Sequence, residues 1–579
     1  MPANPNKLSQ FWQELKRRRV IHVIIVYATA AFVIIELVNN VTEPLELPEW
    51  TPTLVIVLLI IGFPFAIIFS WIYDITLKGI KKTEPIEDTA EVIELHSTRD
   101  NPIVPEKSII VLPFENISPD PDQEYFSDGL TEELITHLSY IKDLLVISRN
   151  SAMTFKGAKK RTNEIADEVN VRYVLEGSVR KSGTKIRITA QLIDALTDTH
   201  IWANKYDGSL DDIFDIQDNV SSSIADSLRL KFSEKAKLRS TGKNFKDPLV
   251  YEIYLKAKYE DWQFKESNLL RGENLLRQGL KLAGDHALLY SELSHVTIQY
   301  VNNLLKDPDS YPKLIEKAIQ YAEKAVILDP TSATSYCAKA LALFQGCNAV
   351  ESFKTFRKAE EVEPYNSDSS LFLLLGYMFA STGVDLNKSE VYLEKCRIMD
   401  PLSPISKTSH GWRFVYQGQF QKAVDEFTEW QNVMEQIKSP ANIWFVWFHG
   451  LNKDFKESFR ILDQVIENHP DHLMARLGSF MKFAWLKERK KAIDSVTEAL
   501  EIAAWWDDAY SLMMAEGYSV LEEYEKAFHF LNRAIDYGIT NVTFLSEYDP
   551  FLKNLKSDKR FRESMDRAKN IVKSLKQIT

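Results

Sequence analysis

Three acidic side chains alternate along the segment NISPDPDQEYFSDG, residues 116–129, as calcium ligands alternate in an EF-hand loop. They are Asp120, Asp122 and Glu124. An EF-hand loop also requires glycine at its sixth position and a bidentate glutamate at its twelfth, whereas this chain has Tyr125 and Thr131 there. Calcium binding is therefore disfavoured, and the composition indicates a turn.

Helix capping explains the same acidic residues. The segment is rich in Asn, Ser, Pro, Asp and Gly, which supply turn geometry. It follows a short β-branched run, residues 109–112, which predicts a buried strand that ends at Pro113. Asp128 or Thr131 could cap the helix that comes next. We therefore expect a strand, a turn and a helix here rather than an active site.

No other motif has the spacing of a catalytic or cofactor site. The segment GSVRKSGTK, residues 177–185, holds the glycines and lysine of a phosphate-binding loop at the wrong spacing and between two strands. His469 and His472 are three residues apart, but Pro470 places them in a turn, which disfavours a metal site. The HExxH and GxSxG motifs are absent from the sequence. The sequence predicts a protein that is not an enzyme and has no cofactor and no metal ion.

Composition narrows the class of partner. The chain has 579 residues and a net charge of -11, whereas a nucleic-acid-binding surface is basic because it must displace counterions from phosphate. We therefore expect no nucleic-acid partner. The three cysteines, Cys337, Cys347 and Cys396, lack the paired spacing of a zinc site and are too few for a disulfide framework, so we expect them to be reduced.

Two apolar segments near the N-terminus have the length that crosses a bilayer. Residues 20–38 and 53–73 are each about 20 residues long and predict a two-helix transmembrane hairpin. A cleaved signal peptide is the alternative for the first segment, because a basic run precedes it. However, the apolar run continues beyond the candidate cleavage site at residue 30, and a second apolar segment follows.

The flanking charges orient this hairpin. Residues 1–19 are basic, residues 39–52 form a short acidic outer loop without Lys or Arg, and residues 74–104 have the mixed composition of a linker. Because positively charged flanks stay in the cytoplasm, we expect both termini and the domains that follow the hairpin to be cytoplasmic.

Strands and helices alternate from residue 105 to residue 240. The clearest element is a hairpin whose strands meet at Ser182 and Gly183, with apolar and polar residues alternating along the second strand. One face of the predicted sheet is therefore apolar. Trp202 and Tyr206 could stack on a ligand, but their spacing favours a packed face.

Four blocks of this region follow one another in the order of a known family. They are IIVLPFENISPDPDQEYFSDGLTEELITHLS, VISRNSAMTFKG, VRYVLEGSVRKSGTKIRITAQLIDALTDTHIWANKYD and IFDIQDNVSSSIA. Over about residues 107–235 they resemble the TolB amino-terminal-like (FlgO-like) domain of bacterial signalling proteins. The resemblance implies a domain without established catalytic residues, which occurs with tetratricopeptide repeats and is often attached to a class III adenylate cyclase domain or a CadC-type winged helix. We expect neither output domain here, because 19 residues before the first apolar segment are too few for one and the later segments have other assignments.

The pattern becomes helical and repetitive over residues 248–545. Alanines recur seven residues apart, which puts them on one helix face and lets a second helix approach closely. Pro330, Pro364 and Pro401 end successive units, because the proline ring prevents helix continuation. This region resembles a tetratricopeptide array of about eight helix pairs, and residues 546–579 have the polar helical character of a terminal cap.

The predicted fold class is multidomain, with a two-helix transmembrane hairpin, an α/β TolB N-terminal-like domain and an all-α tetratricopeptide-repeat solenoid. The predicted function is a non-enzymatic scaffold or adaptor of the bacterial inner membrane, which binds a protein partner through its repeats in signalling or envelope-associated assembly. The alternative is a sensory subunit whose TolB-like domain binds a small molecule and regulates a separate enzyme or transcription factor.

A partner-binding groove is predicted on the concave face of the repeats, which the first helix of each pair lines. Alignment of the units places four apolar side chains at the ninth repeat position: Leu341, Tyr377, Trp447 and Met481. Phe344 and Trp485 lie close by in the same pattern. Buried aromatic anchors of this kind could carry peptide binding. The alternative is that these side chains fill the interface between helices, as aromatic residues at helical spacing often do.

Overall fold

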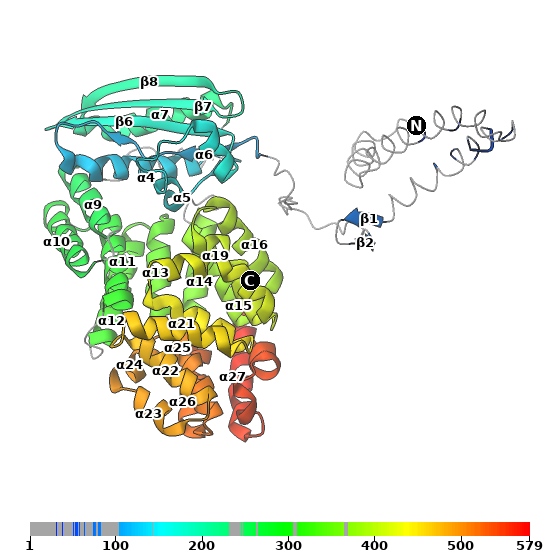
Figure 1. Ribbon diagram of the computed structural model, residues 1–579. Helices are drawn as coiled ribbons and strands as arrows, with labels where there is room; N and C mark the ends of the chain where they lie inside the picture. Colours follow the sequence, from blue (N-terminus) through cyan, green and yellow to red (C-terminus); the bar gives the residue numbers. More distant parts are fainter. Residues whose placement is uncertain are drawn as a thin grey trace. The chain divides into compact units, whose positions relative to one another are not determined.

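The computed structural model describes most of the chain after residue 103 (Figure 1). The described ranges are 104–141, 143–230, 245, 247–261, 265–304, 310–363 and 369–578, together with scattered positions between 31 and 82. Two compact units divide the chain, Met1–Thr98 and Arg99–Thr579. The second unit contains both a mixed-sheet domain and a helical array.

The first unit contains a small strand pair. Strands β1 (Tyr73–Thr76) and β2 (Gly79–Lys82) run antiparallel, with Ile75 opposite Ile80. This hairpin begins where the composition predicts a linker.

The predicted transmembrane spans, residues 20–38 and 53–73, fall mostly outside the described residues. Where the chain is described, no helix combines the length and the apolar character needed to cross a membrane. The transmembrane hairpin is therefore not supported by the structure and stays a prediction.

A six-stranded mixed sheet forms the α/β domain. Its main path runs β5-β3-β6-β7-β8, and β4 pairs with β6. Strand β3 lies parallel to both of its neighbours, and β6, β7 and β8 form an antiparallel meander. The strands are β3 (Ser108–Val111), β4 (Glu115–Asn116), β5 (Leu145–Val146), β6 (Tyr173–Ser182), β7 (Lys185–Asp194) and β8 (Thr199–Ser209).

Four helices pack with this sheet around one hydrophobic core. They are α4 (Glu124–Ser139), α5 (Arg149–Met153), α6 (Thr162–Val169) and α7 (Ile213–Ser227). Along β7, Ile186 and Ile188 are buried while Arg187 and Thr189, which alternate with them, are exposed, because successive side chains of a strand point to opposite faces. Trp202 and Tyr206 also pack against this core, so the packed-face interpretation of these two residues is confirmed.

Helix α4 begins earlier than predicted. Asp120 caps a short turn, Pro121–Gln123, by accepting a hydrogen bond from the backbone N–H of Asp122 at 3.0 Å, and α4 follows at once. Asp128 and Thr131 lie inside α4, so neither caps it. Thr131 instead accepts a hydrogen bond from the backbone N–H of Phe114 at 3.0 Å, which joins the helix to the end of β3.

Eight helix pairs follow within the described residues. They are α9 (Pro248–Asp261) and α10 (Glu266–Ala283), α11 (Ala287–Leu304) and α12 (Tyr311–Leu328), α13 (Ala333–Gln345) and α14 (Ala349–Val362), α15 (Ser369–Thr382) and α16 (Leu386–Met399), α18 (His410–Tyr416) and α19 (Phe420–Gln436), α20 (Ile443–Leu451) and α21 (Phe455–Asn468), α22 (Leu473–Trp485) and α23 (Arg489–Ser495), and α25 (Asp508–Val520) and α26 (Tyr524–Asp536). Short helices α17 (Pro404–Lys407) and α24 (Glu498–Trp505) and a final helix α27 (Lys559–Lys576) complete the array. The tetratricopeptide-like helical solenoid is thus confirmed.

Alanines allow the close approach within several pairs. Ala318 and Ala325 of α12, and Ala527 and Ala534 of α26, are fully buried. Ala492 and Ala499 are also seven residues apart, which predicts one shared helix face, but they do not lie on one helix. Helix α23 ends at Ser495, and Thr497 caps the new helix α24 by accepting a hydrogen bond from the backbone N–H of Leu500, so the predicted face of Ala492 and Ala499 is divided between two helices.

The chain after α26 turns back into the middle of the array. The side-chain amide of Asn541 donates to the carbonyls of Ala380 and Tyr416, at 3.2 Å each. Gly383, with a φ of 67°, makes room for this contact, because a Cβ there would lie 2.9 Å from Asn541 Cγ. Helix α27 then packs against α26 and α14. The inner face of the array is therefore occupied by its own C-terminal segments.

Candidate functional site

Two of the six predicted groove residues lie in the protein interior. Trp447 and Met481 are each 1% exposed, and Nε1 of Trp447 donates to Oε2 of Glu516 on α25 at 2.8 Å. In this arrangement neither side chain is open to a partner, which corrects the prediction that they line an open groove. Their surroundings are the interface between helices that the alternative interpretation describes.

The other four groove residues are half-buried along the same inner face. They are Leu341, Phe344, Tyr377 and Trp485, and the last three contact the last helix pair or the segment after it. Tyr377 Oη donates to Oδ2 of Asp508 at 2.5 Å, and the Phe344 ring centroid lies 6.2 Å from that of Tyr537. The ring of Trp485 stacks on that of Phe551, with the centroids 5.0 Å apart. Burial and the neighbouring carboxylate raise the pKa of Tyr377 well above its usual range. The partner-binding role of these residues stays a prediction.

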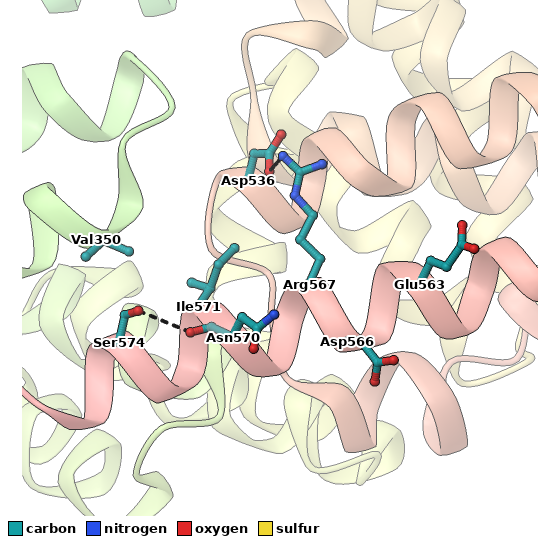
Figure 2. A pocket seen from close by; sticks show the side chains of 8 residues that line it. All are labelled: Val350, Asp536, Glu563, Asp566, Arg567, Asn570, Ile571 and Ser574. Carbon is teal, nitrogen blue, oxygen red and sulfur yellow. Dashed lines mark hydrogen bonds and ion pairs between the residues drawn. The ribbon is translucent and has the colours of Figure 1, made fainter.

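A surface groove with a volume of about 640 Å³ lies where α27 meets α14 and α26 (Figure 2). Asp536 and Arg567 form an ion pair at 2.5 Å, and Val350 and Ile571 add apolar surface. The remaining lining residues are Glu563, Asp566, Asn570 and Ser574. The other two lining carboxylates are ion-paired as well, Glu563 with Lys559 at 3.2 Å and Asp566 with Lys569 at 2.9 Å. The groove therefore combines apolar surface with exposed ion pairs.

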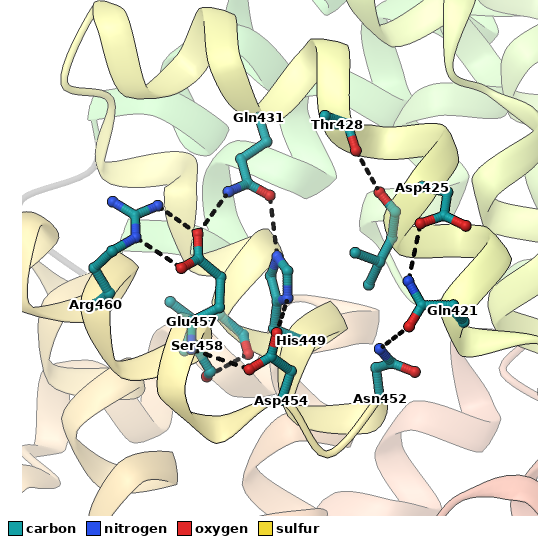
Figure 3. Close-up of polar contacts among 12 residues, drawn as sticks. Gln421, Asp425, Thr428, Gln431, His449, Asn452, Asp454, Glu457, Ser458 and Arg460 are labelled. Carbon is teal, nitrogen blue, oxygen red and sulfur yellow. Dashed lines mark hydrogen bonds and ion pairs between the residues drawn. The ribbon is translucent and has the colours of Figure 1, made fainter.

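A Ser, His and Asp constellation occurs at α20 and α21, but its geometry is structural (Figure 3). His449 Nδ1 lies 3.6 Å from Oδ2 of Asp454, and its Nε2 faces Oε1 of Gln431 at 3.1 Å. Ser458 is fully buried and donates to the carbonyl of Val446 at 2.8 Å. Because the imidazole faces an amide and the hydroxyl is held by the backbone, this group does not form a nucleophile and base. Its hydrogen bonds hold α19, α20 and α21 together.

The α/β domain is joined to the helical array first through α4 and α9. Nζ of Lys258 lies 2.5 Å from Oε1 of Glu132, and Oη of Tyr125 donates to Oε1 of Glu252 at 2.6 Å. Burial alone would raise the pKa of Glu132, but Lys258 and Arg149 lower it below its usual value. The glutamate is therefore held as an anion between two cations.

The second junction lies between α5 and the end of α16. Ser151 Oγ donates to Oδ1 of Asp400 at 2.5 Å, and the backbone N–H of Ser148 donates to the carbonyl of Met399 at 2.7 Å. Ser369 and Ser406 donate to the other carboxylate oxygen of Asp400, each at 3.1 Å. Asp400 is 1% exposed, and its Oδ1 receives its hydrogen bond from the α/β domain, so this buried carboxylate is fully satisfied only when that domain is docked.

Neither junction was predicted from the sequence. Pro401 predicts the end of a repeat unit, and that local pattern carries no information about a contact between Asp400 and Ser151. Glu132 and Lys258 offered a partial signal, because charged residues at the inner positions of otherwise apolar helices need partners.

A family model describes part of the chain. The second domain of HilA/YgeH-like transcriptional regulators matches residues 105–223, which fall within the predicted α/β domain. A protein of Rhizobium meliloti (strain 1021), named as an adenylate cyclase, is 36% identical over 244 residues. This match covers 42% of the present chain and 41% of the relative, so the chain spans less than half of that protein's length.

Solved helical-repeat structures resemble parts of the chain at low identity. YrrB, a TPR protein with an unusual peptide-binding site, is 18% identical, with a TM-score of 0.24, over 34% of this chain and 95% of its own. Yeast Tom70 is 15% identical, with a TM-score of 0.30, over 61% and 77%. A human IFIT1 dimer with PPP-AAAA is 14% identical, with a TM-score of 0.30, over 55% and 89%. None of these likenesses is close enough to bear on function.

Proposed function

We propose that this protein is a non-enzymatic scaffold of bacterial signalling, anchored in the inner membrane by residues 20–38 and 53–73. Its TolB-like (FlgO-like) α/β domain and its tetratricopeptide-like array would act as one docking platform for a protein partner. The observation that carries this proposal is the two-point junction, because Glu132 with Lys258 and Ser151 with Asp400 fix the domain on the array. The signalling context is supported by the adenylate cyclase name of the relative and by the regulator family that matches the α/β domain.

The groove at α27 is the surface that we assign to the partner. It combines apolar side chains with the exposed carboxylates of Glu563 and Asp566. Because exposed ion pairs contribute little, basic residues of a protein segment could replace Lys559 and Lys569 as their partners. A nucleic-acid partner is disfavoured by the net charge of -11.

Charge reversal in the groove tests this assignment. The full-length chain is crosslinked in native membranes and purified as the wild type, as the double variant Glu563→Lys with Asp566→Lys, and as the control Glu467→Lys with Asp471→Lys. The control residues are exposed and lie at α21 and the turn after it, away from the groove. Loss of one crosslinked protein in the groove variant alone supports the proposal.

Two other outcomes would contradict it. Equal recovery of the same proteins from all three samples would remove the groove as the binding surface. A melting temperature that rises with a metabolite but not with any protein would favour the alternative of a sensory subunit.

A further inference from the structure

Three potential metal ligands meet where the first two helix pairs of the array pack together. They are Asp261, the last residue of α9, and Glu292 and His295 of α11. One ligand atom from each residue lies within 4.8 Å of the others, and Nδ1 of His295 is 3.0 Å from Oδ2 of Asp261. This cluster takes no part in the proposed function, so the inference stands or falls separately.

The helix geometry suits shared coordination. Glu292 and His295 are three residues apart, so both side chains project from one face of α11. The same Glu-x-x-His spacing supplies metal ligands in helical bundles. Asp261 reaches the same place from the neighbouring helix, so the ligands come from two elements that must already be packed.

The two carboxylates are buried and incompletely satisfied. Asp261 is 3% exposed, and its Oδ1 has no hydrogen-bond partner. Glu292 is 8% exposed, and no hydrogen bond between described residues reaches its carboxylate. A buried carboxylate without a partner costs several kcal/mol, roughly, unless a cation compensates it.

The nearby cations, Lys258 and Arg149, both make their ion pairs with Glu132, although Lys258 also attracts Glu292. Lys258 lies 2.5 Å and Arg149 lies 3.2 Å from the carboxylate of Glu132. Glu133 is a further acidic neighbour of Lys258. Among the described groups around the cluster there are thus four carboxylates and two cationic side chains. The carboxylates are Glu132, Glu133, Asp261 and Glu292, and the cations are Lys258 and Arg149.

We propose that Asp261, Glu292 and His295 bind a divalent transition-metal ion, for which zinc is the probe. Two carboxylate oxygens and one imidazole nitrogen form a ligand set that zinc accepts, and a fourth position would remain for water. Bonds of about 2.1 Å separate the donor atoms by about 3.4 Å in a tetrahedral site, so a small side-chain rotation would close the cluster around the ion.

Gln299 is placed to orient the imidazole. Its side-chain amide lies 3.5 Å from Nε2 of His295, on the far side of the ring from Nδ1. Rotation of the amide would direct its oxygen at the Nε2 proton, which favours Nδ1 as the ligand atom. The bound ion would tie α9 to α11 immediately beside the Lys258 contact with the α/β domain.

Zinc titration of the full-length chain, freed of metal by a chelator, tests the proposal. We expect one equivalent of zinc to bind and to raise the melting temperature, with binding at least tenfold weaker in Asp261→Asn and His295→Gln. The control is His469→Gln, because His469 lies at the end of α21 and its Nε2 contacts the carbonyl of Lys438. Wild-type binding that equals binding by Asp261→Asn, or that disappears in the control, would overturn the proposal.

A spectroscopic variant keeps the test decisive where a substitution impairs folding. Cobalt(II) bound to the wild-type chain should show visible absorption typical of nitrogen and oxygen ligands, and His295→Cys should add a thiolate-to-cobalt charge-transfer band. Absence of that band in a folded His295→Cys chain that contains cobalt would show that the metal lies elsewhere, which also overturns the proposal.

Discussion

The hydroxyl of Ser151 is held 2.5 Å from Oδ1 of Asp400, although 249 residues separate them in the sequence. Because Ser369 and Ser406 share the same carboxylate, the α/β domain and the helical array meet at one buried acceptor. Stability at this point should therefore depend on both partners.

Removal of that acceptor should loosen the docked domain. Asp400→Ala leaves three hydroxyl groups without an acceptor, and we expect it to cost about 2 to 4 kcal/mol of unfolding free energy. Ser151→Ala removes two hydrogen bonds, the one to Asp400 and the one that Ser151 Oγ accepts from the backbone N–H of Leu402 at 2.9 Å, and should cost about 1 to 2 kcal/mol. Hydrogen exchange of α5 and α16 measures the effect, with the exposed Ser267→Ala as the control. Unchanged exchange of α5 in Asp400→Ala would contradict a coupling role for this carboxylate.

Gly383 should be less tolerant of a side chain than another glycine with a similar positive φ. Gly383 has a φ of 67° and Gly157 a φ of 70°, so alanine strains the backbone at either position by about 1 kcal/mol. Only at Gly383 would the new Cβ press on Asn541, since nothing lies within 4 Å of it at Gly157. We expect Gly383→Ala to lower the urea midpoint clearly more than Gly157→Ala does. Equal losses would mean that the segment around Asn541 moves away from the new Cβ at no measurable cost.

The carboxyl pair of Glu516 and Asp549 should make stability fall as the pH rises. Burial and the adjacent acid raise the pKa of Glu516 well above its usual value, and burial raises the pKa of Asp549 to about 6. The folded state thus binds these protons more tightly than the unfolded chain, so their stabilising effect is complete below about pH 4 and is lost as the pH passes through about 6.

Glu516→Gln isolates this effect, because glutamine still accepts the hydrogen bond from Trp447 but does not ionise. Its stability relative to the wild type should rise by on the order of 1 kcal/mol or more between about pH 5 and about pH 7.5. The urea midpoints of the wild type and the variant, followed by tryptophan fluorescence, are compared at each pH. Histidines such as His137, whose pKa burial lowers to about 4, have the opposite effect on stability, but they are present in both chains and cancel in the difference. A constant difference across this range would exclude the pair as the source.

The orientation in the membrane can be tested with single cysteines. In a chain with its three native cysteines replaced by serine, we expect an impermeant thiol reagent added to intact cells to label Glu46→Cys but not Leu95→Cys, since the basic flanks favour cytoplasmic termini. Labelling of Leu95→Cys alone would show the opposite orientation. Labelling of both only after cell lysis would argue against a transmembrane hairpin.

Local patterns predicted the elements of this fold better than their partners. The alternation along β7 and the buried alanines of α12 follow from the periodicity of strands and helices, which the sequence shows directly. Trp447 and Met481 were placed on the correct inner face, but periodicity does not reveal what covers that face. The covering segments come from later in the chain. Whether the face is an open groove or a filled interior therefore depends on tertiary contacts, which local periodicity does not show.

The return of the chain at Asn541 constrains the order in which the protein can mature on the ribosome. In an open repeat protein each unit touches only its neighbours, so early units can complete their packing while later ones are still being made. Here Ala380 and Tyr416 receive their contacts from a residue more than a hundred positions later in the chain. During synthesis the aromatic inner face around Trp447 and Tyr377 stays uncovered until α25 and the segment after α26 have emerged, which makes the nascent chain a target for chaperones throughout that interval.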